Sequence, residues 1–176
     1  MSTHLSKIKG ILGVLGLILQ NFTFASGQDI NAAVTIDEKT AKVHISGELG
    51  SGFARGFRRN IGFVVPEGDP DAVYGLRAKG SNGDEIALTR LRPTEWVAAA
   101  DIEKWSYSKQ LSIANGMSAG RSRIGKTNGI LFFEDLMPIF GPADIAVSSR
   151  INIDLPENWE LFSNASYKGG ILEIND

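Results

Sequence analysis

The sequence contains no cysteine and only two histidines, His4 and His44. The lack of cysteine excludes disulfide bonds, thiolate metal ligands and a cysteine nucleophile. His44 alone cannot support a zinc site of the usual kind, and the metalloprotease pattern H-E-x-x-H is absent. We therefore expect no metal ion and no cofactor, and we predict no catalytic residue.

Positive charge is not in excess either, since 18 Lys and Arg face 20 Asp and Glu. Residues 1–25 contain two lysines and no acidic residue, so without them 16 basic side chains face 20 acidic ones, a net charge of −4. No basic field is available to hold a phosphate backbone, and we expect no nucleic-acid partner. The cluster of Arg55, Arg58 and Arg59 is predicted to be a solvated turn.

Only one long hydrophobic run is present, Ile11 to Leu19, and it is short for a membrane span, which needs about 20 apolar residues. Lys7 and Lys9 precede it, and the small residues Thr23 and Ala25 follow at the spacing that signal peptidase recognises. These features predict a secretory signal peptide with a helical apolar segment.

The signal peptide sets the expected domain organisation. Residues 1–25 are the signal and residues 26–176 form one exported domain, periplasmic or extracellular, of a length that suits a single core. Ala25 and Gly27 offer a second cleavage site. An uncleaved anchor or a buried helix is the alternative, and an uncleaved signal would be the chain's only link to a membrane.

Long helical periodicity is absent after the signal, and alternation with a period of two takes its place. One clear strand runs through Ile145 to Leu155, and another places Ala41, Val43 and Ile45 on one face. A third carries aromatic residues on its buried parity, interrupted by one lysine: Trp105, Tyr107, Lys109, Leu111 and Ile113.

Turn residues separate further short strands. Asn82 and Gly83 predict a tight hairpin between strands at 73–79 and 85–91. Other strands are expected at 61–65, 95–100 and 167–174. Short strands with regular turns predict an all-β fold, an antiparallel β-sandwich preceded by the N-terminal signal helix.

The apolar run Ile130 to Phe133 lies in the stretch around which we expect the fold to be organised. It predicts a buried strand, with Phe132 and Phe133 in the interior. A single helical turn within 136–140, cut by Pro138, would follow.

Two catalytic patterns occur in the glycine-rich loop before this run. Gly120 to Thr127 matches the phosphate loop G-x-x-x-x-G-K-[ST], which needs a helix directly after it. An Asn-Gly pair and a strand are expected there instead, so we expect no nucleotide. Gly116 to Gly120 matches the nucleophile elbow G-x-S-x-G, but no histidine follows Ser118 to act as its base.

Two groups of acidic residues are further candidates, one for a calcium site and one for an acid/base pair. Glu67, Asp69 and Asp71 could give oxygens to calcium, although their spacing is not that of an EF-hand, and we predict a surface turn. Glu134 and Asp135 are adjacent, so on a strand they would point to opposite faces and could not act as an acid/base pair.

Residues from about 57 to 162 resemble a known family. Thr127 to Pro138 is similar to the glycine, apolar run, acidic residue, Leu, apolar residue, Pro segment in the N-terminal domain of glycyl-aminopeptidase-like metalloproteases. Ile153 to Trp159 resembles that family's strand exit, with Asn158 in place of a glycine. Trp105 to Tyr107 lies where the family has an aromatic strand.

The resemblance implies a β domain that precedes a thermolysin-like catalytic domain and a PDZ domain. The chain ends at Asp176, where the catalytic domain would begin, so we expect a truncated or split form or a β domain that stands alone. No functional residue is carried over.

The preferred hypothesis is a non-catalytic exported domain, structural or binding a peptide or protein such as a metalloprotease catalytic domain. The first alternative is a free-standing glycan- or surface-binding module that uses Trp96, Trp105 and Trp159, of which Trp105 is predicted to belong to the core. The second is an enzyme that uses the Lys126 loop.

Overall fold

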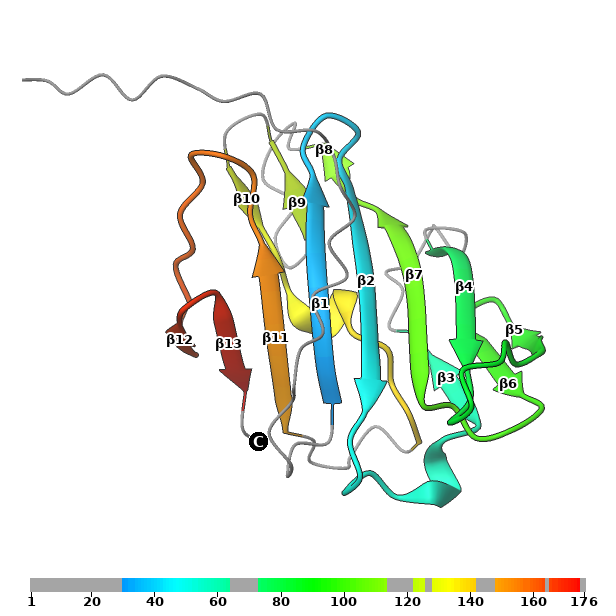
Figure 1. The fold of residues 1–176 in the computed structure, drawn as a ribbon. Coiled ribbons are helices and arrows are strands. Elements are labelled where there is room, and N and C mark those ends of the chain that lie inside the picture. Colours follow the sequence, from blue (N-terminus) through cyan, green and yellow to red (C-terminus); the bar gives the residue numbers. More distant parts are fainter. Residues whose placement is uncertain are drawn as a thin grey trace, which may run out of the picture.

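The computed structural model describes residues 30–63, 73–113, 122–125, 128–141, 148–163 and 165–174. In these ranges the chain forms short strands, one turn of α-helix, α1 (Phe133–Leu136), and one turn of 3-10 helix, η1 (Arg55–Phe57) (Figure 1). The all-β prediction is therefore confirmed. The predicted signal peptide lies outside the described residues, and none of the described helices is long and apolar enough to cross a membrane.

A seven-stranded sheet forms the larger layer (Figure 1). Its strands are, in spatial order, β12 (Ser166–Lys168), β13 (Ile171–Ile174), β11 (Ser149–Asp154), β1 (Ile30–Asp37), β2 (Lys42–Leu49), β7 (Lys104–Gln110) and β4 (Val73–Lys79).

This sheet is mixed, which corrects the prediction of a purely antiparallel fold. Strands β1 and β11 pair in parallel, with Val34 opposite Ile153, whereas the other neighbours are antiparallel. Because β1 and β11 lie far apart in the sequence, no local turn signal could reveal the direction of their pairing.

Two smaller sheets complete the described strands. One has the order β3 (Asn60–Gly62), β6 (Glu95–Ala98), β5 (Leu88–Arg92). The other has the order β10 (Gly129–Ile130), β9 (Arg123–Ile124), β8 (Ser112–Ile113), and its strands β8 and β9 are parallel.

The core lies between the large sheet and a second layer made of the small sheets and α1. Phe63 contacts the Tyr107 ring edge to face, with the ring centroids 4.7 Å apart. Phe140, which follows α1, packs on Trp105 from the same side of the sheet. A pair of backbone hydrogen bonds between Gly62 and Ile139 joins β3 to the segment after α1. The arrangement therefore has two layers, but its second layer is broken rather than one continuous sheet.

The predicted alternation is confirmed in the central strands. Val43 and Ile45 are buried, while Lys42 and His44 are exposed. Such an arrangement is expected where one face of a strand packs on a core and the other meets water.

The aromatic strand β7 follows its predicted parity. Trp105, Tyr107 and Leu111 are buried, and Lys109 is buried with them. The Trp105 ring covers Gly47 on the neighbouring strand, where a Cβ atom would lie 2.4 Å from its Cζ2 atom. Only glycine leaves room for the indole at this position.

The predicted hairpin at Asn82 and Gly83 forms only in part. Gly83 has a φ of 85°, and the turn is closed by the Gly80 amide, which donates to the Asp84 carbonyl at 3.1 Å. However, β4 joins the large sheet and β5 joins a small one, and the backbones of the two predicted strands pair at a single bridge, between Lys79 and Glu85. The turn chemistry was correct, but pairing with β7 and β6 separates the strands.

The apolar run at 130–133 does not form the predicted buried strand. Ile130 is 44% exposed, Phe132 is 38% exposed and Phe133 is half-buried. Strand β10 ends at Ile130, and α1 begins at Phe133, earlier than the predicted helical turn. The expectation that Phe132 lies in the interior was therefore wrong.

The last predicted strand, 167–174, is a hairpin. Gly169 and Gly170 have φ values of 60° and 84°, as a type I′ turn requires, and they join β12 to β13. The two glycines therefore form a turn where the sequence predicts one continuous strand. This hairpin brings β12 to the outer edge of the large sheet (Figure 1).

Candidate docking groove

An open groove of about 980 Å3 lies beside the β12–β13 hairpin. The segment that follows β11, residues 155–163, forms one wall together with Ala165 and Ser166, and strand β10 with the start of α1 forms another. Ile36, Ile153 and Leu172, which are buried side chains of the large sheet, line its inner part. The groove therefore opens onto the apolar interior of the domain.

The wall at Trp159 depends on two special backbone positions. A turn in which the Trp159 amide donates to the Pro156 carbonyl at 3.1 Å follows β11. Asn158 in this turn has a φ of 70°, a conformation that glycine adopts freely and asparagine tolerates better than most residues. Asn158 stands where the resembling family has glycine, and the positive φ explains why asparagine can replace it.

Gly129 provides the surface on which Trp159 rests. A Cβ atom at Gly129 would lie 3.1 Å from Trp159 Cζ3 and 3.0 Å from the Arg123 carbonyl oxygen. The missing side chain lets the indole pack directly on the β10 backbone. Trp159 is half-buried as a result and lines the groove.

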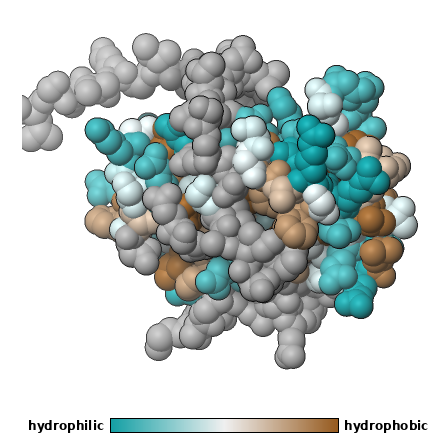
Figure 2. All heavy atoms as spheres, turned by 90° about the horizontal axis from the view of Figure 1, so that it is seen from below, coloured by the Kyte–Doolittle hydropathy of each residue, from teal (hydrophilic) through white to brown (hydrophobic). Residues whose placement is uncertain are grey.

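Large apolar side chains are exposed around the groove. Phe162 is 88% exposed and, like Ile130, lines it. Phe132 and Tyr167 are also exposed, and each is next in sequence to a lining residue. On the face of the molecule seen from below, apolar residues reach the surface between hydrophilic ones (Figure 2). Large apolar side chains that are exposed around one groove commonly mark an interaction site.

Among the described residues that line the groove, Glu160 and Glu173 are the charged ones. Both are exposed. The site combines an apolar lining, an aromatic wall and negative charge, which suits binding better than proton transfer.

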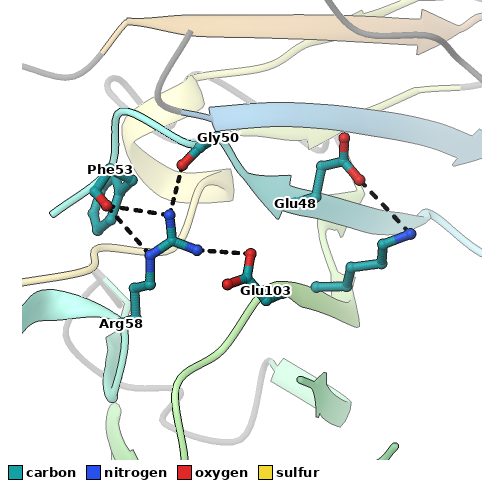
Figure 3. Close-up of polar contacts among 6 residues, drawn as sticks. Glu48, Gly50, Phe53, Arg58 and Glu103 are labelled. Carbon is teal, nitrogen blue, oxygen red and sulfur yellow. Dashed lines mark hydrogen bonds and ion pairs between the residues drawn. The ribbon is translucent and has the colours of Figure 1, made fainter. Parts of the chain in front are cut away.

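The predicted solvated cluster at 55–59 behaves differently at its central residue. Arg58 is buried, and its guanidinium donates to the carbonyls of Gly50, at 2.6 Å, and Phe53 (Figure 3). It also forms an ion pair of 2.7 Å with Glu103. The prediction was wrong for Arg58, which ties the loop after β2 to the start of β7. Arg59 is exposed and pairs with Asp101 at the surface.

The acidic pair at 134–135 lies on α1 and not on a strand, which corrects that expectation. The Asp135 carboxylate accepts the Ser122 amide at 2.8 Å, and the Asp135 carbonyl accepts Lys109 Nζ. The Ser122 hydroxyl accepts the Phe132 amide at 2.8 Å. Asp135 and Lys109 therefore anchor α1 to the sheet, and Glu134 is exposed beside them.

The phosphate-loop match does not have its required setting. Lys126 and Thr127 lie outside the described residues, as does the elbow pattern at 116–120. The chain on either side of 126–127 forms the antiparallel strands β9 and β10, and the Gly125 amide donates to the Asn128 carbonyl. Strand β10 follows the motif but ends at Ile130, so the described residues directly after the motif form no helix of the kind that a phosphate loop needs.

The other sequence candidates are dispersed. His44 is exposed, as predicted, and its Nδ1 lies 3.1 Å from the Ser108 hydroxyl. Trp105 is in the core, as predicted, whereas Trp96 is half-buried between Phe63 and the Arg90 guanidinium. Glu67, Asp69 and Asp71 lie outside the described residues. Across the described ranges, no three His, Cys, Asp or Glu residues are grouped as metal ligands would be.

Of the tryptophans named from the sequence, Trp159 is the one that reaches the groove. Phe162, Glu160 and Glu173 were missed. A signal for Phe162 did exist, because an aromatic residue in a polar stretch without strand alternation has no core position to occupy.

No protein-family model matches the sequence, and no curated protein matches it. Among solved structures, the chain is similar to the crystal structure of an aminopeptidase N family protein from Idiomarina loihiensis, with a TM-score of 0.60 and 14% sequence identity. The similarity covers 84% of this chain and 27% of that one, so this chain spans about a quarter of the length of its structural relative. The chain therefore shares the fold of one part of an aminopeptidase N family protein.

Proposed function

We propose that this chain is an exported, non-catalytic β domain that binds a protein partner through the groove beside β12 and β13. The observation that carries the proposal is the exposure of Phe162 and Ile130 at the rim of an apolar groove. Phe162 is 88% exposed. A partner that covers such a side chain stabilises the complex by about 25 cal/mol per Å2 of apolar surface removed from water.

The proposed partner is a metalloprotease catalytic domain. The fold matches a quarter of an aminopeptidase N family protein, and the sequence resembles the N-terminal domain of glycyl-aminopeptidase-like metalloproteases. Such a domain would lie beside its catalytic domain, whether in a separate chain or a longer one. The finer family assignment and the PDZ domain of that family belong to this proposal.

Affinity purification of the tagged full chain from its source organism tests the proposal. We expect a zinc metalloprotease to be recovered with the wild-type chain and lost with Phe162→Ala. Leu91→Ala, which truncates an exposed side chain of β5 away from the groove, is the matched control. Aminopeptidase activity in the purified chain by itself would refute the non-catalytic role, and equal recovery with Phe162→Ala would refute the groove.

A glycan-binding role is the second candidate, and the position of Trp159 favours it. The indole lines the groove near an exposed aromatic side chain, which is how many proteins present a stacking surface to a sugar ring. A glycan array that shows binding by the wild-type chain and none by Trp159→Ala would support this candidate. Binding that persists in Trp159→Ala would exclude the groove as the glycan site.

A further inference from the structure

The charged residues that line the groove indicate which charge a bound partner should carry. Among the described residues that line it, Glu160 and Glu173 are the charged ones, and the others are apolar or small and polar. Within the described part of the chain, neither carboxylate forms an ion pair, although Arg150 lies opposite Glu173 in the β11–β13 register. Both carboxylates are therefore available to a cationic group that enters the groove.

The edge of the large sheet at β12 indicates which backbone conformation a bound partner could adopt. Strand β12 pairs with β13 on one side, and among the described strands it is the last one of the large sheet on the other. Ser166, its first residue, lines the groove. An outer strand presents unpaired backbone donors and acceptors, and an extended peptide can add to it as a further strand.

We propose that the groove binds an extended protein segment that carries large apolar side chains together with lysine or arginine. The apolar side chains cover Trp159 and Phe162, and the cationic side chain pairs with Glu160 or Glu173. This inference rests on the proposed protein-binding function and specifies the chemistry of the bound segment. The two carboxylates also disfavour a membrane as the occupant, because anionic headgroups would be repelled.

Selection from a library of short random peptides displayed on phage, with the full chain as bait, tests the proposal. We expect the enriched peptides to combine apolar residues with Lys or Arg. Synthetic versions of these peptides should lose about two- to fivefold in affinity for Glu160→Gln and for Glu173→Gln, and the loss should shrink in high salt.

The controls separate this inference from the proposed function. Glu85→Gln removes an exposed carboxylate that is not among the lining residues and should leave affinity unchanged. Peptides whose affinity falls in Phe162→Ala but not in Glu160→Gln or Glu173→Gln would refute the proposed pairing with a cationic side chain. They would leave the proposed protein-binding function in place. Failure to enrich any peptide would overturn both. Binding of phosphatidylserine vesicles that is lost in Phe162→Ala would identify a membrane surface instead and refute the inference.

Discussion

The indole of Trp159 lies against the backbone of Gly129, and a Cβ atom at Gly129 would come within 3.1 Å of the ring. The contact joins the segment after β11 to strand β10, two parts of the chain that are distant in sequence. It holds one wall of the groove in place. The groove should therefore respond to a single added methyl group at this position.

We expect Gly129→Ala to destabilise the domain by about 1 kcal/mol, since the added methyl group must displace the Trp159 ring or the Arg123 carbonyl. Urea unfolding followed by circular dichroism measures this change. Gly56→Ala is the matched control, because a Cβ atom there meets nothing within 4 Å. Its expected effect is neutral or slightly stabilising. Equal effects of the two substitutions would contradict the packing of Trp159 on Gly129.

The buried Arg58 gives a second prediction. Arg58→Met keeps the apolar bulk but removes the guanidinium that donates to the Gly50 and Phe53 carbonyls and pairs with the Glu103 carboxylate. Since an unsatisfied buried polar group is costly, we expect a loss of about 3 kcal/mol in the free energy of unfolding. Chemical denaturation of the purified variant measures the loss.

Arg59→Met is the control for this experiment. Arg59 pairs with Asp101, and both side chains are largely exposed. A surface pair contributes less than about 1 kcal/mol, so the control should unfold near the wild-type midpoint. If Arg59→Met cost as much as Arg58→Met, burial would not be the reason for the importance of Arg58.

The central strands could be predicted from the sequence because alternation reports burial directly. Val43, Ile45, Trp105 and Tyr107 lie in the core as their parity requires. The parallel pairing of β1 with β11 could not be predicted, because residues from distant parts of the chain determine it. The departure of β5 from β4 has the same cause, although the turn at Gly83 was recognised.

The groove could not be predicted for a different reason. Apolar residues that line an open groove give the same sequence signal as apolar residues in a core. The run at 130–133 predicts a buried strand, yet Ile130 and Phe132 are exposed. Ser122 explains the local departure, because its hydroxyl bonds the Phe132 backbone just before α1 begins. That contact depends on tertiary structure, which the run itself does not encode.

Export of the chain is the third prediction. The signal predicted at residues 1–25 should be removed after Ala25, so the mature protein should begin at Ser26. Mass spectrometry of the protein recovered from the periplasm or medium identifies the N-terminus. Ala25→Arg should block this cleavage, and a new N-terminus at Gln28 would show that the second site after Gly27 is used instead. Recovery of the intact chain from the cytoplasm alone would contradict export.

The β1–β2 turn provides a prediction on pH. The Thr40 hydroxyl donates to the Asp37 carboxylate at 2.6 Å, and this hydrogen bond, together with the backbone amides of Thr40 and Lys39, lowers the pKa of Asp37. A carboxyl group with a lowered folded pKa stabilises the fold above its unfolded pKa, and this contribution is lost as pH falls through the folded pKa. Thr40→Val should therefore raise the pKa of Asp37 and destabilise the protein more at neutral pH than in acid.

Carboxyl-carbon NMR titration and denaturation at both pH values measure these effects. Thr35→Val, which removes an exposed hydroxyl that makes no hydrogen bond to Asp37, should leave the pKa in place. An unchanged Asp37 pKa in Thr40→Val would show that the backbone amides alone hold the charge.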